Sequence, residues 1–438
     1  MNGKMLKFHL KRAAGTVIAK IAPLTHFLPA GPRAKVRNAV LRTAGLSRGN
    51  APRRDPLPWQ PGLYPDGVNL FGFFKAQNGL AQGVKLYARA LEQTGLPCRF
   101  LNTDFLYWLP QNDTDWDSRL SADAPYAVNV IHINPDQWTE ACNCFPIETF
   151  DGRYTVGVWL WELEDIPAAW HAQLQSVDEL WAPSDFIADA LKKVSPVPVT
   201  TIPYGITAPA EEGLTRKDFG LPQDKFLVLV MFDSNSYASR KNPAGAIDAF
   251  LEAFGNRPKD AHLVIKLNNP SRKDLKFIRE RLGKKGPYTL LTETLSKKRL
   301  NSLIGLCDVY LSLHRSEGFG LVMAEAMLLG VPVVATGWSA NTQFMTADTA
   351  CLVDYTLVPV GDAYQYGNEK HRWADPDVHQ AAAYLRRLKD DPAWRRDLAA
   401  RGQRHIAENF SVEKTAALMR RRLSEILKGA GNTAAPGQ

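Results

Sequence analysis

The amino-acid sequence predicts an α/β protein built from two doubly wound, Rossmann-like domains that face a cleft, with a basic arm in front of them. Short apolar segments alternate with helical ones in two successive series, a rhythm typical of parallel sheets. The chain has 438 residues, 45% of them hydrophobic and 22% charged, enough for about two to three domains with cores of their own. The expected parts are an arm over 1–60, a first domain over 61–205, a second over 206–390 and C-terminal helices over 391–438 that pack back on the first domain.

The basic charge is concentrated in the arm. Residues 1–60 contain twelve Lys and Arg but one acid, so they carry +11, and the rest of the chain carries −3 of the net +8. The segment MLKFHLKRAAGTVIAKIAPL mixes apolar and basic residues at loosely helical spacing, which is typical of an amphipathic helix on a membrane surface. Lys20 and Pro23 interrupt it, so it is too short to span a bilayer. A solvated tail is the alternative.

The first series of strands and helices starts near Val68. The turn Asn78-Gly79 opens a helix over 82–92, and the small, acidic stretch after Ile202-Pro203-Tyr204-Gly205-Ile206 is typical of a connector. The strands expected in this series are 68–74, 126–133, 154–160 and 178–184.

The second series is clearer. Asn242 followed by Pro243 predicts the N-cap and first turn of a helix that runs to Phe254. After Pro376 the chain is helical to about Lys428. The strands expected here are 225–232, 261–267, 288–291, 308–314 and 331–336. In such sheets ligands bind beyond the carboxyl ends of the strands.

The stretch 311–339 carries the chemistry. A strand ends at His314, and the loop Ser316-Glu317-Gly318-Phe319-Gly320 leads into a helix over 321–329. Glycines let the backbone approach a ligand, and the free amides of a helix N-terminus favour an anion, so the pattern predicts a diphosphate cradle. Two acids cannot bind phosphate. We therefore expect Glu317 in the loop and Glu325 in the helix to accept hydrogen bonds from sugar hydroxyls on either side of the diphosphate.

This stretch resembles the retaining glycosyltransferases of family 4, in particular bacterial envelope-polysaccharide and lipopolysaccharide mannosyltransferases. Their mark is two glutamates separated by seven residues around a GFG core, as in 317–325, and the resemblance covers roughly 68–425. It implies the GT-B fold. It also implies that Glu317 holds the donor sugar and Glu325 the nucleotide ribose, while the donor phosphates lie against Gly318, Phe319, Gly320 and Leu321.

Further positions follow the family pattern less closely. The resemblance implies that Lys241 binds the donor diphosphate and that Gly79 faces it across the cleft. The family usually has an arginine several residues before this lysine, whereas here Arg240 is adjacent and Ser234-Asn235-Ser236 fills the earlier place. Arg240 is thus a less direct match.

The sequence offers two candidates for the residue that contacts the acceptor. Many relatives have a cleft histidine after a strand of the first domain, and the sequence has His132 after one strand and Glu162 near the usual histidine position after the next. A hydrogen-bonded structural histidine is the alternative for His132. His314 and Arg315 precede the donor loop and could reach its phosphates, or they could simply end the strand.

The leading hypothesis is a retaining hexosyltransferase that uses a nucleotide diphosphate sugar and needs no metal or other cofactor. A non-catalytic sugar-nucleotide-binding protein is one alternative. The other is a metal-dependent transferase, because Asp113 and Asp115, with Asp117 nearby, could ligate Mg²⁺ or Mn²⁺. The five cysteines contain no CxxC pair, so they indicate no zinc site.

The arm and the resemblance together suggest the partners. We expect a lipid-linked or lipopolysaccharide glycan as acceptor, an anionic membrane surface as the partner of the arm, and a cytoplasmic protein that is peripheral on the inner face of the cytoplasmic membrane. GDP-mannose is the first donor expected, with UDP-sugars next. No aromatic and basic platform indicates nucleic-acid binding.

Overall fold

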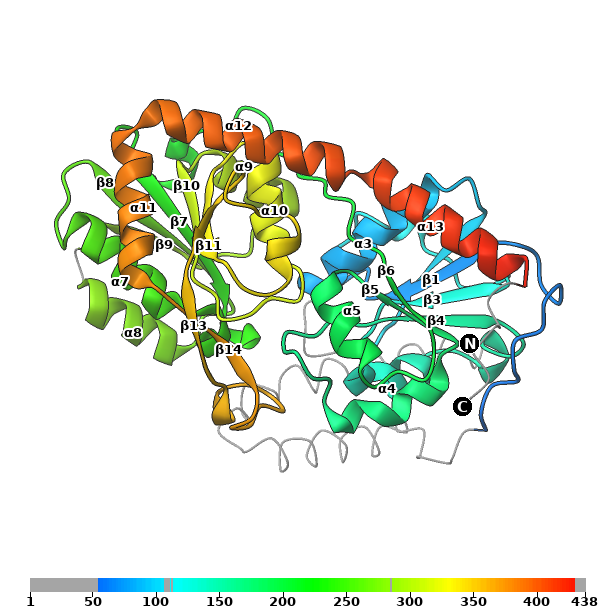
Figure 1. Cartoon of the computed structure of the whole chain (residues 1–438). Coiled ribbons are helices and arrows are strands. Elements are labelled where there is room, and N and C mark those ends of the chain that lie inside the picture. Colours follow the sequence, from blue (N-terminus) through cyan, green and yellow to red (C-terminus); the bar gives the residue numbers. More distant parts are fainter. Residues whose placement is uncertain (1–53, 106–110, 112, 284–285, 430–438) are drawn as a thin grey trace, which may run out of the picture.

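The computed structural model describes residues 54–105, 111, 113–283 and 286–429. This part of the chain forms two α/β domains side by side, each with a parallel sheet at its centre (Figure 1). The predicted amphipathic helix of the arm lies outside the described residues.

The first sheet is parallel and its strand order is β2-β1-β3-β4-β5-β6. Every residue of β1, β3, β4 and β5 is buried, which explains why these strands are mainly apolar, because helices cover both faces of such a sheet. The helix α3 begins at Gly79 because the side chain of Asn78 accepts a hydrogen bond from the amide of Ala81 at 2.9 Å. The elements are β1 (Val68–Gly72), α3 (Gly79–Glu92), β2 (Cys98–Asn102), β3 (Val128–Ile131), α4 (Trp138–Cys142), β4 (Tyr154–Val158), β5 (Glu179–Ala182), α5 (Asp185–Lys192) and β6 (Val199–Thr201).

The second sheet repeats this design with the order β12-β11-β10-β7-β8-β9, again parallel throughout. Its elements are β7 (Phe226–Asp233), α6 (Ala238–Lys241), α7 (Pro243–Phe254), β8 (Ala261–Asn268), α8 (Arg272–Leu282), β9 (Tyr288–Leu291), α9 (Lys297–Gly305), β10 (Val309–Ser312), α10 (Leu321–Leu328), β11 (Val333–Thr336) and β12 (Cys351–Val353).

Both sheets reverse their strand order in the middle. In the first, β1 and β3 are neighbours at the reversal, and in the second β7 and β10 are. Loops that leave adjacent strands in opposite directions open a crevice at the carboxyl edge, where ligands of doubly wound folds bind. Gly79 and His132 follow β1 and β3, and Lys241 and Glu317 follow β7 and β10.

An antiparallel hairpin, which the sequence pattern did not indicate, extends from the second domain towards the first (Figure 1). It consists of β13 (Tyr355–Pro359) and β14 (Arg372–Pro376). Around it, Val360, Tyr364 and Trp373 share one buried apolar cluster with Trp161 and Trp170 of the first domain. The hairpin therefore joins the two domains.

The C-terminal helices are α11 (Val378–Asp390), α12 (Pro392–Asn409) and α13 (Val412–Leu427). They run along one side of both domains, and α13 packs on α3 of the first domain (Figure 1). The guanidinium of Arg422 in α13 lies 2.7 Å from the fully buried carboxylate of Glu179 in β5. A buried carboxylate requires such a partner, so this ion pair fixes α13 to the sheet.

Candidate active site

The loop between β10 and α10 needs its two glycines for steric reasons. Gly320 is the N-cap of α10 with φ of +95°, a left-handed conformation that a side chain disfavours. A Cβ on Gly318 would lie 2.9 Å from the carbonyl oxygen of Trp161 in the first domain. Phe319 between them is buried and contacts the rings of Tyr204 and Phe344 at centroid distances of 5.0 and 5.3 Å. The loop is thus held against the first domain.

Glu317 lies between two cations. Its carboxylate is ion-paired with Nζ of Lys241, and it lies 3.3 Å from Nη1 of Arg240. Its amide donates to Oγ of Ser339 at 2.8 Å. Burial alone would raise the pKa of Glu317, but the charges of Lys241 and Arg240 outweigh it and lower the pKa to about 2. Glu317 is therefore an anion at every ordinary pH.

The two cations come from a tight turn after β7. Asn242 has φ of +48° and caps α7 by accepting a hydrogen bond from the amide of Gly245 at 3.1 Å, as the Asn-Pro pair predicted. Lys241 is partly exposed, whereas Arg240 is 5% exposed and donates to the carbonyl of Ser316 at 2.9 Å. Lys241 is thus the cation more accessible to a ligand, and Arg240 organises the loop.

Glu162 links the first domain to this site. Its Oε1 lies 3.6 Å from Nη2 of Arg240, and its Oε2 accepts a hydrogen bond from the hydroxyl of Tyr364 at 2.6 Å. Its carbonyl oxygen accepts from the hydroxyl of Ser316. The guanidinium of Arg240 therefore lies between two carboxylates, that of Glu162 from the first domain and that of Glu317 from the second.

Glu325 lies in the middle of α10, 1% exposed. Its Oε2 is 2.6 Å from Nζ of Lys297, the first residue of α9. Sequence reasoning missed Lys297, although a lysine that opens a helix was a visible signal.

The other predicted residues are not members of these ion pairs, although the amide of Arg315 donates to the carbonyl of Arg240 at 2.7 Å. His314 is fully buried, its Nε2 donates a hydrogen bond to Oδ1 of Asn341 at 3.0 Å, and burial lowers its pKa. Arg315 pairs with Asp375 of β14 at 2.7 Å. A Cβ on Gly79 would meet nothing within 4 Å, so the start of α3 is open to a ligand.

His132 is also fully buried. Its Nε2 lies 2.8 Å from the hydroxyl of Tyr204, whose ring contacts Phe319. Burial lowers the pKa of His132 to about 4, so it is neutral at physiological pH. It stands behind the donor loop, connected to it through Tyr204.

Lysines form ion pairs with two of the aspartates that were considered as metal ligands. Asp113 is ion-paired with Lys85 at 2.5 Å and accepts from the amide of Asp115, while Asp117 pairs with Lys75 at 2.8 Å. Within the described ranges, no group of three or more His, Cys, Asp or Glu side chains is arranged to hold a metal ion.

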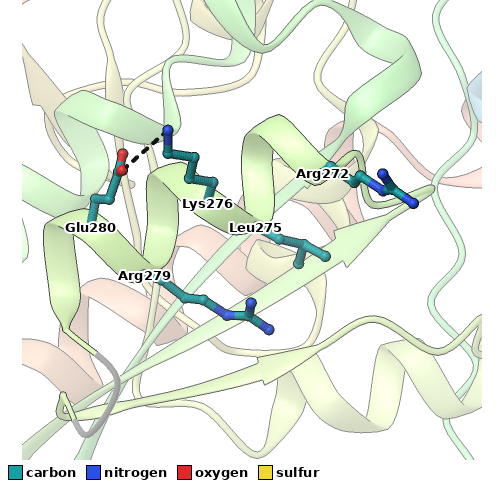
Figure 2. Close-up of a pocket in the computed structure, with 5 residues that line it drawn as sticks. All are labelled: Arg272, Leu275, Lys276, Arg279 and Glu280. Carbon is teal, nitrogen blue, oxygen red and sulfur yellow. Dashed lines mark ion pairs between the residues drawn. The ribbon is translucent and has the colours of Figure 1, made fainter.

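A surface depression of about 380 Å³ lies elsewhere, along one face of α8 (Figure 2). All its lining residues belong to that single helix, and two of them, Lys276 and Glu280, pair with each other at 3.6 Å. We regard the carboxyl edge of the second sheet as the candidate site, because buried charges and a helix N-terminus converge there.

Solved structures show which fold this is. The chain is similar to sucrose-phosphate synthase from Thermosynechococcus elongatus, with a TM-score of 0.60 and 16% identity over 84% of this chain and 100% of that one. It is similar to Anabaena Alr3699/HepE in complex with UDP and glucose, with a TM-score of 0.56 and 14% identity over 83% of this chain and 100% of that one. The protein has the GT-B fold of glycosyltransferases, as the resemblance implied.

The family match falls in the second domain. Residues 213–350 match the family described as "Glycosyl transferases group 1". The lipopolysaccharide core biosynthesis glycosyltransferase LpsD of Rhizobium meliloti is 27% identical over 198 residues, which are 45% of this chain and 49% of LpsD. The matches span 43 to 63% of the length of the curated relatives.

Proposed function

We propose that the protein is a retaining glycosyltransferase that moves a hexose from a nucleotide diphosphate sugar to a glycan. The observation that carries this proposal is the convergence of Lys241, Glu317, Glu325 and the N-terminus of α10 at the carboxyl edge of the second sheet. Cations and free amides suit a diphosphate, and the two carboxylates suit hydroxyl groups on either side of it.

In this proposal the ion pair of Lys241 with Glu317 is exchanged when the donor binds. The ammonium of Lys241 turns to the diphosphate, and Glu317 accepts hydrogen bonds from the sugar. Lys241 and the α10 amides then stabilise the charge that develops on the leaving diphosphate. That diphosphate helps to deprotonate the acceptor hydroxyl on the same face of the sugar, so configuration is retained and no carboxylate nucleophile is needed.

The acceptor side is proposed to involve Glu162. It shares Arg240 with Glu317, so it is positioned by the same group that positions the donor loop. His132 is proposed to act indirectly, because it is fully buried behind Tyr204.

The acceptor class is proposed to be a lipid-linked or lipopolysaccharide glycan at the inner face of the cytoplasmic membrane. The +11 charge of residues 1–60 supports contact with an anionic surface, and the name of the relative LpsD supports the acceptor class. No helix in the described ranges is long and apolar enough to cross a membrane. GDP-mannose remains the first proposed donor. UDP-sugars follow closely, since the structure of HepE contains UDP and glucose.

A thermal-shift screen over GDP-mannose, UDP-glucose and UDP-N-acetylglucosamine tests the donor. A ligand at 100 times its dissociation constant adds about 2.7 kcal/mol of stability. The stabilising donor is then incubated with lipid-linked oligosaccharide, and the anomeric configuration of the product is read by NMR. Stabilisation without turnover would favour the non-catalytic binding protein, and an inverted product would overturn the retaining mechanism.

We also propose that transfer needs no metal. The positive charge for the diphosphate would come from Lys241 and from the α10 amides. Activity should survive EDTA, and added Mn²⁺ should change the rate less than about twofold. Complete loss in EDTA that Mn²⁺ restores would instead favour Asp113 and Asp115 as ligands.

A further inference from the structure

Three cations stand in the first turn of α9, where the helix dipole disfavours positive charge. Lys297, Lys298 and Arg299 follow the N-cap Ser296, and no acid accompanies them in that turn. Positive charge near a helix N-terminus costs stability because the free amides already carry partial positive charge. A segment that departs from a local preference in this way is a candidate for function.

Lys297 differs from its two neighbours in what its ammonium contacts. Nζ of Lys297 lies 2.6 Å from Oε2 of Glu325, whose side chain is 2% exposed. Lys298 is exposed, and Arg299 stacks on the ring of Phe219 at 4.9 Å. A buried carboxylate needs a close positive partner, and Lys297 supplies that charge beside Glu325.

This contact leaves Glu325 able to bind a diol. A carboxylate offers about four lone-pair positions on two oxygens, and Oε2 of Glu325 accepts no hydrogen bond although Nζ of Lys297 lies 2.6 Å away. These positions suffice for the two adjacent hydroxyls of a ribose. The side chain of Lys297 is 23% exposed, so α9 places a partly accessible cation beside a carboxylate that points from α10.

We propose that Lys297 is a positioning residue that fixes the carboxylate of Glu325 for the two ribose hydroxyls of the donor nucleotide. This inference rests on the proposed function, because it takes a nucleotide as the ligand of Glu325. A merely structural ion pair would stabilise the fold but would not distinguish a ribose from a deoxyribose.

Calorimetric titration with UDP, GDP and their 2′-deoxy forms tests the inference. The unmutated protein should prefer the ribonucleotide to its deoxy form by about tenfold, which corresponds to about 1.4 kcal/mol. In Lys297→Met, affinity for the ribonucleotide should fall about tenfold, whereas affinity for the deoxynucleotide should barely change. The ratio of the two affinities should therefore approach one. Lys298→Met, which removes the same charge from the next position, should keep the tenfold preference.

Lys297→Met could destabilise the protein, since it leaves a buried carboxylate without its cation. Lys297→Gln supplies a neutral donor in the same place and should show the same loss of preference. In the Glu325→Gln background, Lys297→Gln should have no further effect on the ratio, because the group that it positions is already neutral.

The outcomes separate the two proposals. If Lys297→Gln keeps the ribose preference, or if Lys298→Met loses it equally, the positioning role of Lys297 is wrong while the proposed function stands. If the unmutated protein binds none of the four nucleotides, the proposed function fails and this inference fails with it.

Discussion

Glu317 and Glu325 are the same residue type on one loop and helix, but different cations hold them. Glu317 is paired with Lys241 and Arg240 from the turn after β7, whereas Glu325 is paired with Lys297 from α9. Because the two carboxylates belong to separate ion-pair networks, neutralising one should leave the other in place. This separation allows their roles to be tested one at a time.

Glu325→Gln should weaken both the nucleoside diphosphate and the nucleotide sugar, each by about 1 to 3 kcal/mol, because hydrogen bonds to a charged group are lost. Glu317→Gln should leave nucleoside diphosphate affinity almost intact while transfer falls, since only the position of the sugar is disturbed. Lys241→Ala should impair both binding and transfer. Calorimetry and a transfer assay measure these patterns, with exposed Glu280→Gln as control. Unchanged transfer in both glutamate variants would refute the site.

His132 should make stability depend on pH. Burial lowers its pKa from 6.5 to about 4, so between these values the unfolded chain binds more protons than the folded protein. Stability contributed by neutral His132 is present above pH 6.5 and is lost as the pH falls to about 4. Burial also lowers the pKa of His262 to about 4, so His262 contributes to the same pH dependence between pH 6.5 and 4.

The melting temperature of His132→Gln should therefore fall less steeply than that of the unmutated protein between pH 6.5 and 4. His262→Gln should flatten the profile independently, because His262 lies in β8 of the second sheet whereas His132 follows β3 of the first. Parallel profiles for His132→Gln and the unmutated protein would show that His132 does not titrate in this window.

At the scale of elements, the β13–β14 hairpin is the piece that brings the two domains together beside the site. Tyr364 after β13 donates to Glu162 at 2.6 Å, and its ring lies 5.7 Å from that of Trp161. Ser239 next to Arg240 donates to the carbonyl of Ala363 at 2.6 Å. The hairpin thus contacts Glu162 and the turn that carries both cations.

Tyr364→Phe should keep the ring contacts and remove one hydrogen bond to a carboxylate, lowering the free energy of unfolding by about 1.5 to 3 kcal/mol. Transfer should fall further than donor binding, because Glu162 then loses one of its two partners. Tyr366→Phe is the matched control, since Tyr366 is 40% exposed. Thermal melts and transfer rates measure both, and equal effects of the two variants would mean that the hydroxyl of Tyr364 does not position Glu162.

The sequence predicted the buried strands of both sheets because continuous apolar segments such as β7 and β8 can hardly form anything else between turn signals. It did not indicate β2, β6 or β12, which lie at the sheet edges. The strands β6 and β12 have three residues each, and β2 is partly exposed, so the apolar signal of all three is weak. Nor did it indicate the hairpin, since β13 is partly exposed and carries no strict alternation.

In the candidate site too, features with a local sequence pattern were predicted and contacts between distant elements were not. The Asn-Pro cap follows a local pattern and was predicted with its contact, whereas the glycine loop was predicted but the closeness of Gly318 to Trp161 was not. The partners Lys297 and Tyr364 could not, because they reach Glu325 and Glu162 from other elements, and only the folded chain brings those elements together. Arg240 was predicted as a phosphate ligand, and its burial between two carboxylates depends on the closeness of both domains.

At the scale of the whole molecule, the charge of the chain is divided between the arm and the folded body. Residues 1–60 carry +11, and the remaining residues carry −3. The guanidinium of Arg54 is already paired with Asp151 of the first domain, so it belongs to the folded body. A truncation that ends after Arg53 therefore removes the basic charge of residues 1–53 and keeps this contact.

Removing residues 1–53 should leave a folded protein that binds its donor but loses much of its affinity for anionic liposomes. Each basic residue near such a surface contributes about 1 kcal/mol, and the attraction is screened over a Debye length of about 8 Å at physiological ionic strength. Flotation of the full-length protein should thus weaken as salt is added. A full-length variant with the Lys and Arg of 1–53 replaced by Gln separates charge from apolar insertion, and it should float as poorly as the truncation. Equal flotation of all three proteins would remove the membrane role of the arm and leave the site in the second sheet unaffected.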